Sequence, residues 1–276
     1  MPKSWFLRGA LAVGLIFLYG PILLLIAYSF NDNRLVTVWS GFSFRWYGEL
    51  MQNAQLLEAA WLSLRIAFIT ACGAVVLGTM AGLLMARFGP FRGRALFGGM
   101  ISAPLVMPEV IMGLSLLLLF VSLEQLIGWP AGRGTTTIVI AHITFTMSFV
   151  AVVIQSRLVS LDASLEEAAM DLGARPAKVF FVITLPIIAP SVVAGWLLAF
   201  TLSLDDLVIA SFVSGPGSTT LPMVVFSSVR LGVSPQINAL ATIVVAVVAV
   251  GIVIAGVMNA RAERTRRRDE QMAQQG

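Results

Sequence analysis

The chain has 276 residues, of which 58% are hydrophobic and only 12% are charged, and its mean hydropathy is +0.91. These values exclude an ordinary water-soluble domain and indicate a membrane protein. The formal net charge of +4 and the pI near 9.8 come largely from basic residues at predicted membrane edges, which favours contact with anionic membrane lipid over binding to nucleic acid.

Six stretches reach the roughly 20 apolar residues that a helix needs to cross the hydrocarbon core of a bilayer. We expect all of them to be helices, because lipid offers no water to backbone amides, and the alternation typical of an outer-membrane barrel is absent. The sequence therefore predicts an all-α, polytopic membrane protein. Its predicted spans are residues 9–30, 61–86, 97–122, 135–158, 187–212 and 238–258.

The distribution of Lys and Arg predicts the orientation. With residues 1–8 as a cytoplasmic tail, most of the 18 basic residues lie on the cytoplasmic side, so both termini are expected there. The first span resembles a signal sequence, but it is too long and lacks a small-x-small cleavage site, so we interpret it as a retained anchor. Residues 31–60 then form a periplasmic loop. The main transmembrane domain is residues 61–258, with a cytoplasmic loop at 159–186 and a basic cytoplasmic tail at 259–276.

The second span contains Gly78 and Gly82, one helical turn apart. Small residues at this spacing let another helix approach closely. Packing within the chain is the favoured interpretation, and a subunit interface is the alternative.

Three carboxylates lie within predicted spans: Glu109 in the third, and Asp205 with Asp206 in the fifth. A lone charge at mid-bilayer costs roughly 3 kcal/mol, so these side chains are expected to face a cavity, a partner or a substrate. Pro104 and Pro108 are expected to loosen the helix before Glu109. Adjacent helical positions point about 100° apart, so at most one Asp should face a lumen squarely. The alternative is that all three carboxylates make structural pairs.

Few residues are available for chemistry. Cys72 is the single cysteine and permits no internal disulfide, and His142 is interpreted as a helix-packing or cavity group. We predict no catalytic constellation, no metal site and no cofactor. The phosphate loop of an ATPase needs a lysine in the pattern G-x4-G-K-[ST]. The only lysines, Lys3 and Lys178, do not stand in that pattern, so the sequence predicts no phosphate-loop ATP site in this chain.

The stretch "DASLEEAAMDLGA", residues 162–174, interrupts this apolar chain. Ser164 and Glu167 form an S-x-x-E pattern that predicts a capping box, and Gly173 predicts a left-handed helix stop. Two helical turns are unstable alone in water, so the helix must pack on the protein's own helix ends or on another protein. Its predicted apolar stripe consists of Leu165, Ala168, Ala169 and Leu172.

Extended toward residue 186, this stretch resembles the "EAA" loop of binding-protein-dependent ABC importer permeases, E-A-A-x3-G-x9-I-x-L-P. The resemblance implies a type I importer permease (MetI-like) fold with six transmembrane helices. It further implies that the short helix docks in a cleft of an ATP-binding subunit. The coupling residues so implied are Glu167, Ala168, Ala169, Gly173, Leu185 and Pro186.

Longer stretches, including "APLVMPEVIMGLSLLLLF" and "LLAFTLSLDDLVIASFVSGPG", resemble polyamine importer permeases, most closely those of putrescine importers. This resemblance implies a bacterial inner-membrane complex with a second related permease, two copies of an ATP-binding subunit and a periplasmic polyamine-binding protein. The implied substrate is putrescine or spermidine, with Glu109, Asp205 and Asp206 on its pathway. The loops at 31–60 and 213–237 are candidate docking surfaces for the binding protein.

Two other classes of protein are the alternatives. An ion-coupled or channel-type transporter of cations also uses broken helices at the membrane midplane, and the two prolines of the third span fit that pattern. A helix that docks an external motor has no purpose in such a protein, however. A membrane enzyme is disfavoured because the chain offers one His and one Cys.

Overall fold

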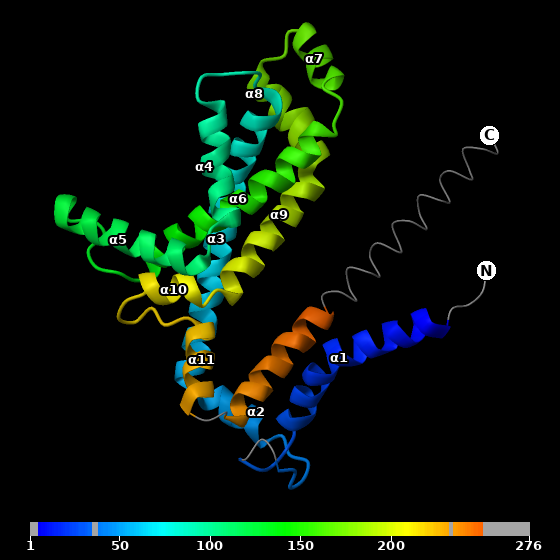
Figure 1. The fold of residues 1–276 in the computed structure, drawn as a ribbon, viewed down its shortest axis with the longest axis vertical. Coiled ribbons are helices and arrows are strands. Elements are labelled where there is room, and N and C mark those ends of the chain that lie inside the picture. Colours follow the sequence, from blue (N-terminus) through cyan, green and yellow to red (C-terminus); the bar gives the residue numbers. More distant parts are fainter. Residues whose placement is uncertain (1–4, 35–37, 232–233, 251–276) are drawn as a thin grey trace. The chain divides into compact units, whose positions relative to one another are not determined.

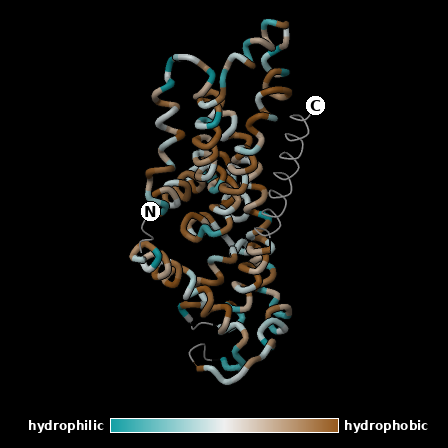
Figure 2. The backbone as a smooth tube through the Cα atoms, turned by 90° about the vertical axis from the view of Figure 1, so that its right-hand side faces the viewer, coloured by the Kyte–Doolittle hydropathy of each residue, from teal (hydrophilic) through white to brown (hydrophobic). Residues whose placement is uncertain are grey.

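The computed structural model describes residues 5–34, 38–231 and 234–250. This part of the chain is helical, and its β-pairing is limited to one isolated antiparallel bridge between Asn31 and Phe42. Within the described residues, five helices are long and apolar enough to cross a membrane. Figure 2 shows that hydrophobic residues dominate along the long helices, as the composition requires.

The chain divides into two compact units, residues 1–57 with 227–276, and residues 58–226. The first unit includes α1 (Trp5–Ser29), α2 (Arg45–Gln52) and the helix Pro235–Val250. The apolar side chains of α1 are almost all exposed. This is the exposure expected of a helix whose solvent is lipid.

Polar side chains join α2 to the start of the helix Pro235–Val250. Glu49 accepts hydrogen bonds from Arg45 Nε at 2.6 Å and from Gln236 Nε2 at 3.2 Å, and Asn53 Nδ2 donates to Gln236 Oε1 at 2.8 Å. The hydrogen bond from Arg45, followed by that from Gln236, lowers the pKa of Glu49. These contacts hold α2 and Asn53 against the start of the helix Pro235–Val250.

The second unit holds most of the helices (Figure 1). Their bounds are α3 (Ala54–Arg87), α4 (Arg94–Val106), α5 (Glu109–Ile127), α6 (Thr135–Val159), α7 (Ser164–Asp171), α8 (Pro176–Val179), the π-helix η1 (Phe180–Thr184), α9 (Leu185–Asp205), α10 (Val208–Val213) and α11 (Leu221–Leu231). Two of them, α3 and α11, continue past the limits of the unit.

Helix α6 provides the core of this unit. It packs against α9 and α4, and its side chains enter both hydrophobic clusters of the unit, with Ile138 in one and Ile154 in the other. Gly78 and Gly82 of α3 lie against it. A Cβ on Gly78 would come within 2.7 Å of Val150 Cβ, and one on Gly82 within 2.9 Å of the Ala151 carbonyl oxygen. The prediction that these glycines serve packing within the chain is confirmed.

Two predicted spans were wrong as single helices. The span predicted at 97–122 is divided between α4 and α5, because Pro108 has no N–H to donate and holds Met107 in an extended conformation. Pro104, by contrast, is accommodated inside α4. The span predicted at 187–212 begins earlier and stops at Asp205, and α10 follows after Asp206 and Leu207.

The remaining spans agree with the structure to differing extents. The predicted spans at 9–30 and 135–158 coincide with α1 and α6, and the one at 61–86 lies inside the longer α3. The predicted span at 238–258 is helical up to residue 250. Its remainder, Lys3 and the tail at 259–276 lie outside the described residues.

Candidate functional site: α7 and the carboxylate cavity

Helix α7 begins one residue earlier than the capping box requires. Ser164 is the first helical residue, Ala163 occupies the N-cap position, and no side chain caps the helix. The Ala163 carbonyl oxygen instead accepts the N–H groups of Glu166 and Glu167, each at 3.0 Å. Because the Ser164 side chain stands inside the first turn, it cannot serve as the cap, and the predicted capping box is wrong.

Asp162 stabilises the chain just before α7. Its Oδ1 accepts the backbone N–H of Ser164 at 3.0 Å. This hydrogen bond, followed by one from the Ser164 side chain, lowers the pKa of Asp162. The local signal was present in the sequence, since Asp commonly bonds the N–H two residues ahead at the start of a helix.

The end of α7 agrees with prediction. Gly173 adopts a left-handed conformation with φ of +84°. Its N–H donates to the Met170 carbonyl at 2.9 Å, and the N–H of Ala174 donates to the Ala169 carbonyl at 3.1 Å. These two bonds form a Schellman motif, in which a residue without a Cβ avoids the strain of positive φ. The glycine stop is confirmed.

The two faces of α7 have different surroundings. Glu166 faces the rest of the unit: its carboxylate accepts from Arg87 Nε at 2.8 Å and from Thr184 Oγ1 at 2.8 Å. Glu167 and Ala168 are exposed, Ala169 is half-buried, and Leu172 is 90% exposed. The predicted apolar stripe is thus largely uncovered by the described part of the chain. Figure 1 shows α7 beside α8 at one end of this unit.

The rest of the motif forms a continuous helical rod of mixed geometry. Pro176 is the first residue of α8, where a missing N–H costs nothing, as predicted. The π-helical turn η1 follows, closed by the Leu185 N–H on the Phe180 carbonyl. Pro186 then stands in the first turn of α9, where the wider turn before it accommodates a residue that cannot donate to the ladder. Leu185 is half-buried and Pro186 is exposed.

The three carboxylates predicted within spans meet at one cavity of about 250 Å³. Glu109 is the first residue of α5, directly after the Pro108 break. Asp205 ends α9, and Asp206 lies in the break before α10. The remaining wall is apolar and is formed by Phe145, Leu202, Leu207 and Val208. Two interrupted helices therefore bring acidic groups that are far apart in sequence to one place.

The two Asp side chains have different environments. Asp205 is exposed, whereas Asp206 is only 8% exposed and contacts several hydrogen-bond donors of the protein. Its carboxylate accepts the N–H of Ile209 at 3.3 Å and that of Ala210 at 2.7 Å, and it lies 3.1 Å from His142 Nε2. The expectation that at most one Asp faces an open space squarely agrees with this arrangement.

His142 is a functional candidate that the sequence interpretation did not use. It is 1% exposed on α6, and its Nδ1 lies 2.7 Å from the hydroxyl of Ser203 on α9. The available signal was its rarity, because an ionisable side chain inside an apolar span usually has a specific partner. Its partners were not evident from sequence, because they lie 61 and 64 residues away.

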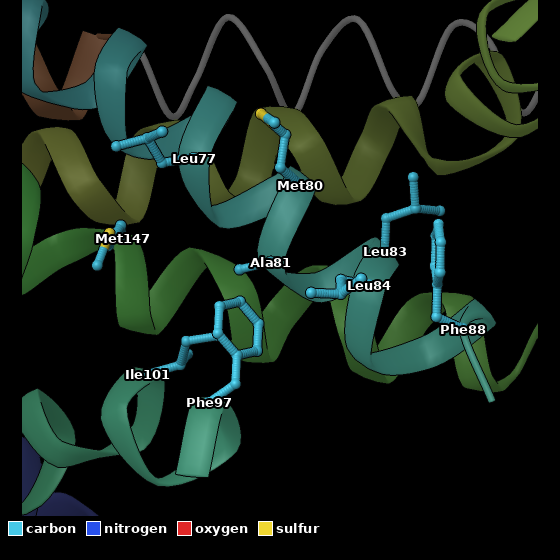
Figure 3. A pocket seen from close by; sticks show the side chains of 9 residues that line it. All are labelled: Leu77, Met80, Ala81, Leu83, Leu84, Phe88, Phe97, Ile101 and Met147. Atoms are coloured by element: carbon cyan, nitrogen blue, oxygen red, sulfur yellow. The ribbon is translucent and has the colours of Figure 1, made fainter. Parts of the chain in front are cut away.

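A larger cavity of about 590 Å³ lies between α3, α4 and α6. Its lining consists of apolar side chains, among them Leu84, Phe97 and Met147 (Figure 3). A charged solute placed there would lose its hydration without gaining a polar partner. The smaller cavity with the carboxylates is therefore the better candidate for binding a cation.

These features define a polytopic helical membrane protein with features of a transport permease. They are the long apolar helices, the interrupted spans with acidic groups at the breaks, and the short uncovered helix α7. Solved structures share the fold. A bacterial ABC transporter for the acidic polysaccharide alginate superposes with a TM-score of 0.70 at 18% identity, covering 94% of this chain and 98% of that one. A chain of the MetNI methionine ABC transporter, in inward-facing conformations, gives 0.59 at 17% identity, covering 75% of this chain and 95% of that one.

Sequence comparison resolves the class further. Residues 78–268 match the model of the binding-protein-dependent transport system inner membrane component, and the chain belongs to this family. It is 62% identical to the putrescine transport system permease protein PotI of Escherichia coli (strain K12) over 266 residues, covering 96% of this chain and 95% of that protein. It is 42% identical over 245 residues to the spermidine/putrescine transport system permease protein PotC of the same organism, covering 89% and 90%.

Proposed function

We propose that this chain is the membrane-spanning permease subunit of an ATP-driven polyamine importer, which moves putrescine or spermidine into the cytoplasm. The carboxylate cavity carries this proposal. A polyamine is a flexible polycation, and Glu109, Asp205 and Asp206 line one cavity whose remaining wall is apolar. The 62% identity to a putrescine permease over nearly the whole chain supports the same substrate class.

The chain performs no covalent chemistry in this proposal. It pairs with a second, homologous permease to form the pathway, two copies of an ATP-binding subunit hydrolyse ATP, and a periplasmic polyamine-binding protein delivers the substrate. The complex lies in the bacterial inner membrane, in contact with lipid, with six spans and both termini in the cytoplasm. Residues 31–60 and 213–237 face the binding protein.

Helix α7 is the coupling element of the proposed transporter. Its exposed stripe, with Ala168 and Ala169 small enough for close approach, suits a cleft in the ATP-binding subunit. Glu167 belongs to the same exposed surface, and Gly173 ends the helix so that the chain returns toward Leu185 and Pro186. Motion of α7 then reaches α9 through the continuous rod formed by α8 and η1.

Reconstituted uptake tests the proposal. The complete importer is placed in proteoliposomes, and uptake of labelled putrescine is measured with an intact ATP-binding subunit and with one that binds ATP without hydrolysing it. Uptake only with the hydrolysing subunit is expected. Transport that persists without hydrolysis would instead support an ion-coupled or channel-type transporter of cations. Competition among putrescine, spermidine and spermine then identifies the preferred polyamine.

A further inference from the structure

Three buried side chains form a hydrogen-bonded chain next to the carboxylate cavity. Ser203 on α9, His142 on α6 and Asp206 at the break before α10 are 5%, 1% and 8% exposed. An ionised carboxylate only accepts hydrogen bonds, so His142 Nε2 donates to Asp206 Oδ2. In the neutral ring, Nδ1 then accepts the hydroxyl of Ser203, and both ring nitrogens are satisfied.

Contacts within the protein therefore use most of the hydrogen-bonding capacity of the Asp206 carboxylate. Two backbone N–H groups of α10 and the imidazole of His142 surround its carboxylate, so it caps the first turn of α10. A carboxylate held by three N–H donors has little remaining capacity for an ammonium group. Although Asp206 contributes to the cavity wall, its main contacts are within the protein.

Asp205 is in the opposite situation. It is the last residue of α9, it is exposed, and it shares the cavity with Glu109. The direction of its side chain depends on where α9 stops, and α9 stops where Asp206 leaves the helix with ψ of 125°. The contacts that hold Asp206 therefore help to set where Asp205 points.

We propose that His142 is a positioning residue for polyamine transport: by donating to Asp206 it holds the break between α9 and α10, so that Asp205, with Glu109, presents a free carboxylate to the substrate. This inference rests on the proposed function and deepens it. It assigns binding to Asp205 and Glu109 and a supporting role to Asp206, and it explains why a lone histidine stands in an apolar helix.

Two substitutions of His142 separate its two hydrogen bonds. In His142→Gln the amide nitrogen takes the place of Nε2 and can still donate to Asp206. In His142→Asn the amide nitrogen lies near the place of Nδ1, so it reaches Ser203 but leaves Asp206 without a side-chain donor. Both variants keep a polar group of similar size in the buried site. Thr146→Val is the matched control, because Thr146 is equally buried on α6 and, within the described residues, its hydroxyl donates to the backbone carbonyl of His142 and not to another helix.

The measurement is putrescine uptake per ATP hydrolysed, both followed in the same proteoliposomes with the complete importer. His142→Gln is expected to keep more than half of the wild-type ratio, and Thr146→Val to stay within about twofold. His142→Asn is expected to lower the ratio about tenfold, the scale of one charge-assisted hydrogen bond, while ATP hydrolysis stimulated by the binding protein continues. In an Asp206→Asn background, His142→Asn should cause little further loss, because both act through one contact.

The inference requires a higher ratio of uptake to ATP hydrolysis for His142→Gln than for His142→Asn. Equal ratios for His142→Gln and His142→Asn, whether both normal or both low, would overturn the inference, and so would a lower ratio for His142→Gln. Fully independent losses in the Asp206→Asn background would overturn it as well. Wild-type importer that shows no polyamine uptake would contradict the proposed function itself, and uptake by the wild type keeps the two failures distinguishable.

Discussion

Arg87, in the last turn of α3, forms an ion pair with Glu166 of α7, with Nε 2.8 Å from Oε2. Both side chains are largely buried, at 17% and 12% exposure, and Arg87 also donates to the Leu161 carbonyl at 3.3 Å. Glu166 further accepts the hydroxyl of Thr184 in η1. One carboxylate thus connects the short helix to α3 and to the last residue of η1, directly before α9.

Removing one partner of this pair should loosen α7. In Glu166→Ala, Arg87 keeps a largely buried charge without its carboxylate, at a cost of about 1–3 kcal/mol. We expect a lower melting temperature of the purified importer and less uptake per ATP hydrolysed. The charge swap Arg87→Glu with Glu166→Arg serves as the control, because it rebuilds the pair. If the swap is as impaired as Glu166→Ala, the ion pair is not the cause.

Substitution of Gly173 tests the role of the α7 stop. Gly173→Val places a β-branched residue at φ of +84°, which costs roughly 1–2 kcal/mol in backbone strain, although the space around its Cβ is open. The variant should bind the ATP-binding subunit less well or hydrolyse ATP without uptake, as measured by co-purification and paired assays. Gly173→Asn is the matched control, since Asn tolerates the left-handed region. Normal coupling in Gly173→Val would make the stop a local feature only.

Neutralising the cavity carboxylates tests the pathway. The combined variant Glu109→Gln, Asp205→Asn, Asp206→Asn should reduce polyamine uptake at least tenfold, because a cation loses its compensating charges inside the membrane. Co-purification with the ATP-binding subunit should be unchanged, since α7 is not altered. Unchanged uptake by this variant would remove the pathway role. Among the single variants, Asp205→Asn should lower uptake without lowering the melting temperature.

Because α3 and α6 pack closely at Gly78, an added methyl group should destabilise the protein at that position and not at an open one. In Gly78→Ala the new Cβ would lie 2.7 Å from Val150 Cβ and 2.8 Å from the Met147 carbonyl oxygen, so the helices must separate. We expect a loss of about 1–3 kcal/mol in stability, seen as a lower melting temperature in detergent. Gly99→Ala, in α4, is the control because nothing lies within 4 Å of its Cβ, and it should be neutral or slightly stabilising. A harmless Gly78→Ala would contradict the packing described here.

Sequence patterns predicted the helical class and most helix positions because apolar length is a property of consecutive residues. They failed where one side chain redirected the backbone. Pro108 divides the third predicted span, and inside the fifth span the Asp206 carboxylate accepts the N–H groups of Ile209 and Ala210 at the start of a new helix. The capping box failed by one residue, because the S-x-x-E pattern does not specify whether Ser164 lies before the helix or in its first turn.

The candidate site shows the same division. Glu109, Asp205 and Asp206 were identifiable individually, because a carboxylate within an apolar stretch requires a reason. Which Asp remains free was not identifiable, since the answer depends on His142, 64 residues from Asp206 in sequence. Similarly, the motif drew attention to Glu167, whereas Glu166 makes the buried contact with Arg87, 79 residues away.

By itself, the sequence determined that this protein is an all-helical membrane protein, that Gly173 ends a short amphipathic helix, and that it carries the motif of an importer permease, because these properties follow from local composition and spacing. Only the tertiary structure decided that the three carboxylates share one cavity. It also decided that His142 contacts both Asp206 and Ser203, and that Arg87 pairs with Glu166 of α7. These relationships depend on how α3, α6 and α9 pack, and packing joins residues whose separation along the chain leaves no periodic signal.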